Sequence, residues 1–158
     1  MLCCRAKEVG SCQQSHGFKI SGMRVWHAGV EQVLDKAMCK ARSTQMPELL
    51  ASFSADGRHR RIQAVWGPVK ATIMRLLDWI HSTSAPCWHF YSASLLVVYE
   101  GMAQSGEDAK VGCSLIDFAH SFFADGHDTN FEEGLQSLLM MLESITGEES
   151  SSSADKFA

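Results

Sequence analysis

The sequence of 158 residues lacks the features of a membrane-spanning or nucleic-acid-binding protein. Charged residues make up 20% of it and the formal net charge is −4, so no excess of positive charge favours nucleic acid. No apolar run approaches the roughly 20 residues that a transmembrane helix requires. The first residues also lack the apolar centre of a signal peptide. We therefore expect an intracellular protein, cytoplasmic, nuclear or both, with no nucleic-acid partner and no transmembrane segment.

The cysteines lack the paired spacing that zinc sites show. They are Cys3, Cys4, Cys12, Cys39, Cys87 and Cys113. Ordinary reduced thiols fit this pattern and agree with a reducing intracellular compartment, although the adjacent Cys3 and Cys4 also suit lipidation. The sequence contains neither a glycine-rich phosphate-binding loop nor an internal repeat. These absences argue against a P-loop nucleotide site and against a repeat protein.

The apolar content of the sequence, 46%, is ordinary and is enough for one domain with a core. Three parts are expected along the chain. Residues 1–16 show no clear periodicity and are expected to form a poorly ordered leader. Residues 17–146 are expected to form the folded lobe. Residues 147–158 are acidic and rich in serine, a composition typical of a disordered tail.

Two apolar, β-rich runs dominate the middle of the chain. They are Phe90–Gly101 and Val111–His120, and the connection between them contains Gly106. This pattern predicts two adjacent antiparallel strands. A second hairpin is predicted over residues 17–36, with a β-bulge at Gly22, where the apolar alternation slips by one position.

Helical periodicity is expected in three further segments. The first is capped by Ser43 or Thr44, the longest opens at Gly67-Pro68, and the last covers residues 130–147. Residues 121–129 are expected to form a loop. The order of elements predicts an α+β fold, in which helices pack against an antiparallel sheet of about four strands.

Asp117 stands at the end of the second central strand, where a buried carboxylate is costly unless a charged partner meets it. A metal ion on a nucleotide is one such partner, because phosphoryl-transfer enzymes hold Mg²⁺ with an aspartate. The other interpretation is an aspartate that caps a turn. The residues of this segment alone leave both interpretations open.

Four stretches of the sequence, taken in order, resemble motifs of the inositol polyphosphate kinase family. They are Gly17–Val25 with Asp35-Lys36 downstream, Tyr91–Tyr99, Ile116–His120 and His127–Leu139. The third keeps the family's Ile-Asp-Phe-Ala-His intact, whereas in the second Ala93 stands where the family has a serine. The resemblance covers roughly Gly17 to Ile145. It implies a fold like the larger, C-terminal lobe of a bilobal inositol polyphosphate kinase.

The resemblance implies a kinase, that is, a transferase of inositol phosphate metabolism that moves the γ-phosphate of ATP to an inositol phosphate hydroxyl. Its partners would be ATP and the inositol phosphate, and its cofactor would be Mg²⁺. The resemblance further implies that Asp117 binds the metal and acts in catalysis with Ser94, and that His120 faces the inositol phosphate. Lys36 is a candidate for a substrate phosphate contact, with a solvent-exposed lysine as the equal alternative.

One motif of the family, Pro-x-x-x-Asp-x-Lys-x-Gly, is missing ahead of Gly17, and nothing corresponds to the N-terminal lobe. We therefore expect a fragment, a truncated form or a degenerate relative. Alone, it should show no turnover and should self-associate or be marginally stable. Two other functions stay open. One is a non-catalytic binding or regulatory module. The other is an unrelated Mg²⁺-dependent hydrolase, which would need further carboxylates near Asp117, and Asp125 and Asp128 are the only near candidates.

Overall fold

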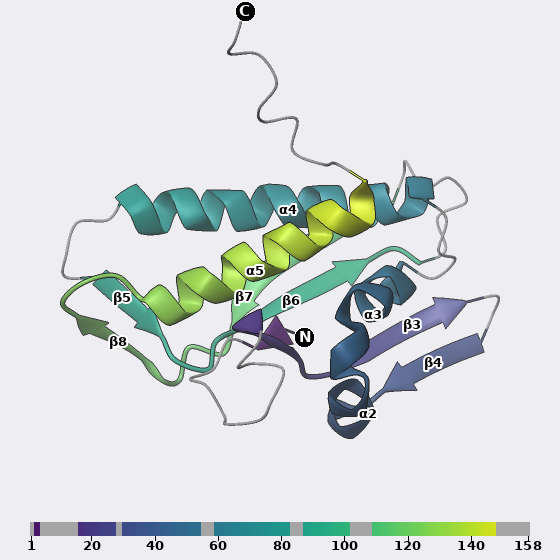
Figure 1. Cartoon of the computed structure of the whole chain (residues 1–158), viewed down its shortest axis with the longest axis horizontal. Helices are drawn as coiled ribbons and strands as arrows, with labels where there is room; N and C mark the ends of the chain where they lie inside the picture. The colour runs from purple at the N-terminus through teal and green to yellow at the C-terminus, as the bar shows by residue number, and fades with distance from the viewer. Residues whose placement is uncertain are drawn as a thin grey trace, which may run out of the picture.

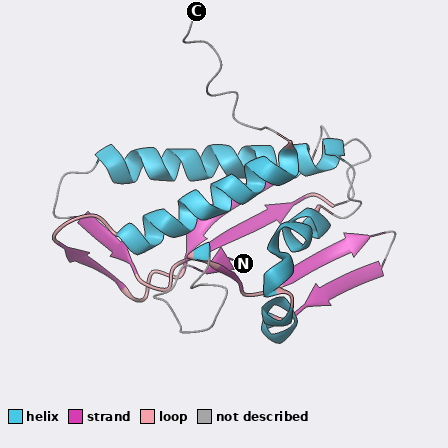
Figure 2. Cartoon of the chain, in the orientation of Figure 1, coloured by secondary structure: helices cyan, strands magenta, loops and turns pink. Residues whose placement is uncertain are grey.

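Two long helices, α4 (His59–Ser82) and α5 (Thr129–Thr146), pack against each other over a layer of short antiparallel strands (Figure 1). The computed structural model describes residues 2–3, 16–27, 30–54, 59–82, 87–101 and 109–147. Figure 2 shows the two helices along one side of the strands. This mixture of antiparallel strands and covering helices confirms the predicted α+β fold.

The strands form one four-stranded sheet and two separate pairs, all antiparallel. The larger sheet has the order β2 (Lys19–Ile20), β1 (Leu2–Cys3), β6 (Ser94–Tyr99) and β7 (Val111–Ile116). The pairs are β3 (Met23–His27) with β4 (Val30–Leu34), and β5 (Cys87–Phe90) with β8 (Ser121–Ala124). The predicted pairing of the two central runs is confirmed as β6 with β7.

The hairpin predicted over residues 17–36 is confirmed as β3 and β4, in which Met23 lies opposite Leu34. Its predicted end is wrong, because Asp35 does not continue the strand. Asp35 instead caps helix α2 (Lys36–Ala41), and its Oδ1 accepts a hydrogen bond from the Met38 N–H at 2.8 Å. An aspartate in this position satisfies an N–H that the first turn of a helix leaves unpaired.

Helix α4 begins at His59, so the predicted start at Gly67-Pro68 is wrong. Proline inside a helix removes one hydrogen bond and costs about 3 kcal/mol. The helix nevertheless continues through Pro68 because its apolar side chains lie on one buried face on both sides of the proline. These side chains are Ile62, Val65, Trp66, Val69 and Ile73. Burying one such side chain contributes about 1.5–3 kcal/mol, so the face as a whole outweighs the proline.

The run predicted as one strand from Phe90 onward is two strands. Strand β5 ends at Phe90, a turn follows, and β6 starts at Ser94. The predicted loop 121–129 is also wrong in its first half, because β8 occupies it and pairs with β5, placing Ser121 opposite Phe90. This pairing joins segments far apart in the sequence, so no local pattern announces it.

Helix α5 starts at Thr129, one residue earlier than the predicted start at Asn130, because Asp128 is its cap. Asp128 Oδ1 accepts from the Phe131 N–H at 3.1 Å, and Oδ2 accepts from the Phe90 N–H at 2.6 Å. The predicted end is confirmed at Gly147, which adopts the left-handed conformation with φ of 70°. One buried carboxylate therefore holds both the helix start and the end of β5.

Helix α3 (Met46–Phe53) follows a 3₁₀ turn over Ser43–Gln45, and no side-chain hydrogen bond caps it. The predicted cap by Ser43 or Thr44 is therefore wrong.

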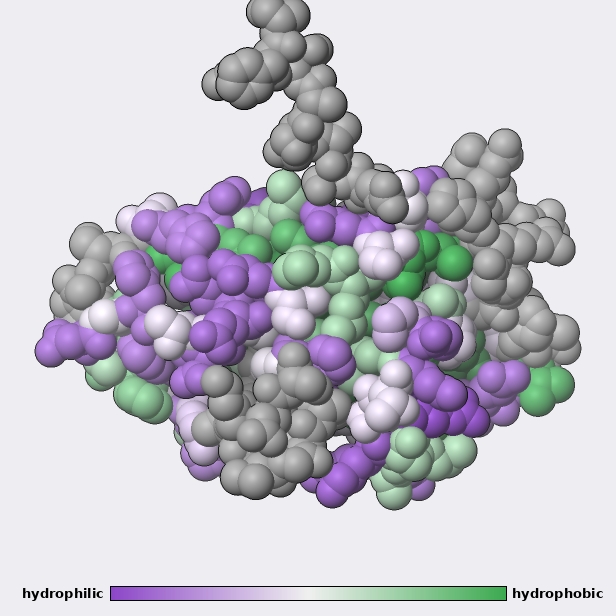
Figure 3. Space-filling model, viewed as in Figure 1, coloured by the Kyte–Doolittle hydropathy of each residue, from purple (hydrophilic) through white to green (hydrophobic). Residues whose placement is uncertain are grey.

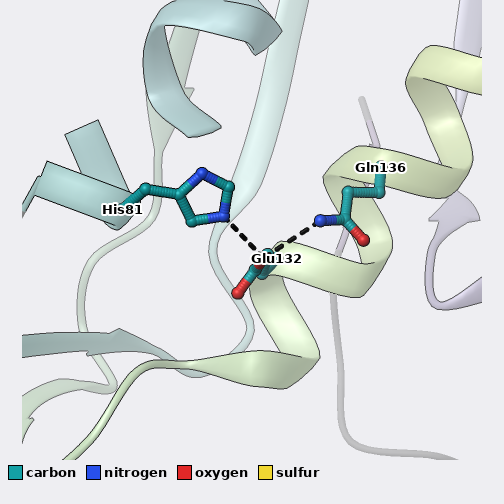
Figure 4. A network of polar contacts seen from close by, with 3 residues as sticks. All are labelled: His81, Glu132 and Gln136. Carbon is teal, nitrogen blue, oxygen red and sulfur yellow. Dashed lines mark hydrogen bonds and ion pairs between the residues drawn. The ribbon is translucent and has the colours of Figure 1, made fainter. Parts of the chain in front are cut away.

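A polar contact between side chains of α4 and α5 ties the two long helices together (Figure 4). His81 Nε2 lies 2.7 Å from Glu132 Oε1, which also accepts a hydrogen bond from Gln136.

The expected leader 1–16 contains strand β1 and His16, and its other residues lie outside the described part of the chain. The acidic tail beyond Gly147 also lies outside it, so both domain boundaries stay predictions.

Within the described ranges, no helix combines the length and the apolar character needed to cross a membrane. On the face shown in Figure 3, hydrophilic and hydrophobic residues are interspersed.

Candidate functional site

The site predicted from the sequence lies at one end of the β6–β7 hairpin. Ser94, the first residue of β6, is opposite Ile116, the last residue of β7, and Asp117 follows directly. His120 comes three residues later, in the turn that leads into β8. We call Ser94, Asp117 and His120 the hairpin-end site. The antiparallel register thus brings together residues that two separate motifs supply.

Asp117 is exposed and adopts a left-handed backbone conformation, with φ of 67°. Aspartate tolerates this region better than most residues. Within the described part of the chain, no hydrogen bond or ion pair engages its carboxylate. The interpretation of Asp117 as a turn cap therefore finds no support. The prediction that Asp117 carries a buried charge at the strand end is also wrong, because β7 ends at Ile116 and the Asp117 side chain is exposed to solvent.

Ser94 is buried, with 1% of its surface exposed, and its hydroxyl has no hydrogen-bond partner among the described residues. A buried hydroxyl left unpaired costs about 1–3 kcal/mol, so such a group calls for a partner that comes from outside. Ala93 beside it is fully buried. Ser92 has a φ of 64°, and with Asp117 it is one of two non-glycine residues with positive φ in the described ranges. Backbone strain of this kind tends to collect at binding sites.

His120 and Lys36 are both exposed, but they lie in different parts of the fold. His120 belongs to the hairpin-end site. Lys36 begins helix α2, which packs on β2 and β4 rather than on the β6–β7 hairpin. The structure therefore groups three of the four predicted site residues and leaves Lys36 apart from them.

Two half-exposed aromatic side chains flank the site in the sequence and were given no role there. Phe118 follows Asp117 and packs edge-on against Phe90, with ring centres 6.0 Å apart. Tyr91 precedes the strained Ser92 and is 49% exposed. The sequence signal that could have identified them is their position, since Tyr91 stands next to Ser92 and Phe118 stands next to Asp117. Exposed rings beside a polar site provide contact surface for a ligand.

The thiol of Cys113 within the hairpin offers no reactive nucleophile. Cys113 lies in the middle of β7, and burial raises the pKa of its thiol to about 11, an effect that Arg75 only partly opposes. The thiol therefore stays protonated at neutral pH, and only a thiolate is a good nucleophile. Cys113 therefore adds no nucleophile to the hydroxyl, carboxylate and imidazole groups of the hairpin-end site.

A divalent cation such as Mg²⁺ fits the hairpin-end site when a phosphate shares its coordination. Mg²⁺ prefers oxygen ligands and commonly takes one or two carboxylates, with waters and phosphate oxygens completing the shell. The described residues contain no group of three or more metal-ligating side chains that would hold an ion alone. Asp128 cannot add a free carboxylate, because both of its oxygens accept backbone hydrogen bonds. The interpretation as a hydrolase with several carboxylates therefore loses one of its two candidate carboxylates, and Asp125 remains the other.

A family match identifies residues 3–143 as inositol polyphosphate kinase. Inositol hexakisphosphate kinase 3 of Mus musculus is 28% identical over 169 residues, which cover 89% of this chain and 42% of the mouse protein. Inositol polyphosphate multikinase alpha of Arabidopsis thaliana is 27% identical over 163 residues, covering 90% of this chain and 56% of the plant protein. The chain thus spans about half the length of the curated relatives that it matches.

The fold is similar to a crystal structure of inositol phosphate multikinase Ipk2 from S. cerevisiae, in complex with ADP and Mn²⁺. The TM-score is 0.60 at 22% sequence identity, and the match covers 85% of this chain and 66% of the yeast chain. The likeness confirms a lobe of the predicted kind. Because the family match extends over most of its residues, the chain belongs to the inositol polyphosphate kinase family.

Proposed function

We propose that this chain is the C-terminal lobe of an inositol polyphosphate kinase that transfers the γ-phosphate of ATP to an inositol phosphate hydroxyl. The observation that carries the proposal is the pair Ser94 and Asp117 at a strained strand end, where neither the buried hydroxyl nor the carboxylate has a partner in the described part of the chain. Relatives are named as inositol phosphate kinases, and the yeast neighbour is a complex with ADP and Mn²⁺.

In this proposal Asp117 provides the carboxylate ligand for Mg²⁺ and leaves the remaining ligand positions to water and to phosphate oxygens. When bound, the cation neutralises negative charge on the phosphate oxygens during transfer. Ser94 has its hydroxyl free to donate a hydrogen bond, and burial keeps that hydroxyl in one position. His120 is exposed in the following turn, where an imidazole can contact a substrate phosphate. Lys36 is kept as a second phosphate contact only if domain closure brings α2 nearer.

Phosphoryl transfer also needs positive groups around the moving phosphoryl. The Pro-x-x-x-Asp-x-Lys-x-Gly motif does not occur in the sequence, so no lysine or aspartate can be assigned to that role. We expect residues 1–158 to show no inositol phosphate kinase turnover alone, because each missing electrostatic group costs about 10²-fold or more in rate. Steady ATP-dependent product formation by the purified chain would contradict this expectation.

The test of the metal role is Asp117→Asn in a protein that carries this lobe and the N-terminal lobe of a relative. A neutral amide is a poor ligand for a hard divalent cation, so turnover should fall by about 10²-fold or more. Asp125→Asn is the matched control, since Asp125 is an exposed aspartate just past β8. His120→Ala should weaken inositol phosphate binding and leave Mg²⁺–ATP binding nearly intact. Wild-type turnover of Asp117→Asn would remove the metal role.

A non-catalytic binding module is the second candidate function. Ala93, fully buried where the family has a serine, favours it because the site then has one hydroxyl fewer. The same two-lobed protein distinguishes the candidates. Binding of inositol phosphate with no transfer, even when the N-terminal lobe and Mg²⁺–ATP are supplied, would favour the module over the kinase.

A further inference from the structure

The end of the molecule that contains β5 and β8 carries most of the exposed aromatic surface. This two-stranded ribbon lies beside the end of α4 and the start of α5, at the opposite end from β3 and β4 (Figure 1). Six of the seven exposed aromatic side chains among the described residues lie there, and the seventh is Trp26 on β3. The six are Trp79, Trp88, Tyr91, Phe118, Phe122 and Phe123. Large apolar patches are rare on monomers and usually mark an interaction surface.

Four of these rings form one continuous face around Phe90. The register pairs Trp88 with Phe123, and their rings meet edge to face with centres 4.9 Å apart. Phe90 stands two residues beyond Trp88, so both side chains lie on the same face of the ribbon. The Phe90 ring is 5.9 Å from that of Trp79 and 6.0 Å from that of Phe118, measured between centres. We call Trp79, Trp88, Phe118 and Phe123 the aromatic face.

The aromatic face is a surface and not a pocket. Trp79 and Trp88 both line a cavity of only about 10 Å³, with Phe131 among the other lining residues. This cavity is too small for a ligand. The four rings themselves are between 41% and 56% exposed. What they offer a partner is a broad area of ring faces and edges.

The charges of the chain are divided unequally along the sequence. Beyond Arg75 stand 13 of the 18 acidic residues but only two of the 14 lysines and arginines, Lys110 and Lys156. Lys110 directly precedes β7, at the end of the β6–β7 hairpin away from Phe118. Lys156 lies outside the described residues. The part of the chain that contains the aromatic face is therefore strongly acidic.

Carboxylates border the aromatic face without basic neighbours to neutralise them. Asp78 precedes Trp79, Asp125 follows β8, and both are exposed. Among the described residues, the ribbon, the turns next to it and α5 contain no lysine or arginine. Arg75, one turn before Trp79 on α4, donates to Thr72 Oγ1 at 3.0 Å and so points back along the helix. The face thus combines exposed rings with negative charge.

We propose that the aromatic face docks an arginine-rich segment of a partner protein. A guanidinium group stacks on aromatic rings and pairs with a carboxylate through two N–H donors, so rings next to carboxylates suit arginine better than any other side chain. Negative charge repels nucleic acid and anionic lipid headgroups, and both are disfavoured as partners. This inference concerns a protein partner and does not depend on the proposed function.

The charges also select this partner over a second copy of the chain. A two-fold interface places the same patch of both molecules against itself. Asp78 and Asp125 of the two copies would then meet like charges, which repel each other. A wholly apolar partner would cover the same carboxylates without pairing them, and a buried, unpaired charge is costly. An arginine-rich segment has neither disadvantage.

The experiment titrates the full chain into a labelled peptide of alternating arginine and glycine and follows fluorescence anisotropy. Low salt and about pH 8 keep the attraction unscreened and ordinary histidines neutral. Trp88→Leu with Phe123→Leu keeps the apolar bulk but removes two rings, and the Kd should rise about fivefold or more. Met74→Leu with Met140→Leu is the matched control on the helices, at side chains that are 54% and 69% exposed. This control should change the Kd by less than about twofold.

A second pair of variants tests the charges. Asp78→Asn with Asp125→Asn should raise the Kd of the arginine peptide about threefold or more. Glu48→Gln with Glu100→Gln removes the same charge from exposed positions on α3 and just past β6, and it should have a smaller effect. A peptide of glutamine and glycine with the same length should not bind.

Several outcomes decide the proposal. Weaker binding of the arginine peptide by both face variants than by their controls supports it. Equal effects of face and control variants, binding of the glutamine peptide, or no binding of the arginine peptide overturns it. A dimer in sedimentation that the leucine pair at Trp88 and Phe123 dissociates also overturns it, because a second copy would then be the partner. Phosphatidylcholine vesicles that bind the parent but not this variant would show a lipid surface instead. Where circular dichroism shows that the leucine pair does not fold, the aspartate pair and its control decide alone.

Discussion

The two ends of the β6–β7 hairpin have opposite polar character. At one end, the Tyr99 hydroxyl donates to the Phe53 carbonyl oxygen at 2.5 Å, and the Arg61 guanidinium lies 5.9 Å from the centre of the Tyr99 ring. At the other end, the Ser94 hydroxyl and the Asp117 carboxylate have no partner within the described chain. One end therefore contributes to folding, and the other keeps its polar groups available for a ligand.

The same contrast separates two aspartates that lie close together in the sequence. Asp128 is buried and both of its oxygens accept backbone hydrogen bonds. Asp117 is exposed, has a positive φ, and makes no side-chain hydrogen bond or ion pair to another described residue. Sequences usually satisfy every local rule except at functional positions, so the aspartate that breaks the rules is the better site candidate. Four stability measurements test this division of roles.

The largest effect is expected for Asp128→Ala. The substitution removes the cap of α5 and leaves the buried N–H of Phe90 without an acceptor. Together these losses should lower the free energy of unfolding by about 2–4 kcal/mol. Urea denaturation followed by far-UV circular dichroism measures the change. Asp125→Ala is the matched control and should leave the midpoint nearly unchanged.

A smaller loss is expected for Tyr99→Phe at the structural end of the hairpin. The change keeps the ring, which packs edge-on against Phe53 at 5.1 Å between centres, and removes only the hydroxyl. Losing this hydrogen bond should cost about 1–1.5 kcal/mol. Tyr91→Phe serves as the control, because Tyr91 is half exposed. Equal midpoints for the two variants would show that the Tyr99 hydroxyl does not contribute to folding.

Ser94→Ala should act in the opposite direction and raise the free energy of unfolding by about 1 kcal/mol. The alanine removes a buried hydroxyl that has no partner among the described residues, so folding no longer strips water from an unpaired polar group. Thermal unfolding by calorimetry measures the shift. In a two-lobed kinase the same variant should turn over more slowly. A destabilised Ser94→Ala would show that the hydroxyl has a structural partner after all.

The smallest effect on stability is expected for Asp117→Asn. Its carboxylate has no partner in the described chain and is solvated, and asparagine also tolerates a positive φ. The melting temperature should stay within error of the parent chain at neutral pH. A clear drop would mean that Asp117 caps the turn, and it would remove the contrast with Asp128.

Much of the site could be predicted from the sequence because its residues stand in short, distinctive motifs. The alternating runs on either side of Gly101 predicted the β6–β7 pairing, and this pairing alone brings Ser94 to Asp117. The stop of α5 at Gly147 was equally local, since glycine is the residue that best adopts a left-handed helix end. The sequence itself therefore determined the pairing of neighbouring strands and the helix end, because both depend on residues close together in the chain.

The tertiary structure decided the features that depend on distant partners. Helix α4 passes through Pro68 because burial of its apolar face outweighs the lost hydrogen bond. The pairing of β5 with β8, the choice of Asp128 as cap, and the solvent exposure of Asp117 follow from contacts between segments far apart in the chain. Local propensity differs by only about 1 kcal/mol between most residues, so burial and long-range hydrogen bonds decide wherever the two disagree.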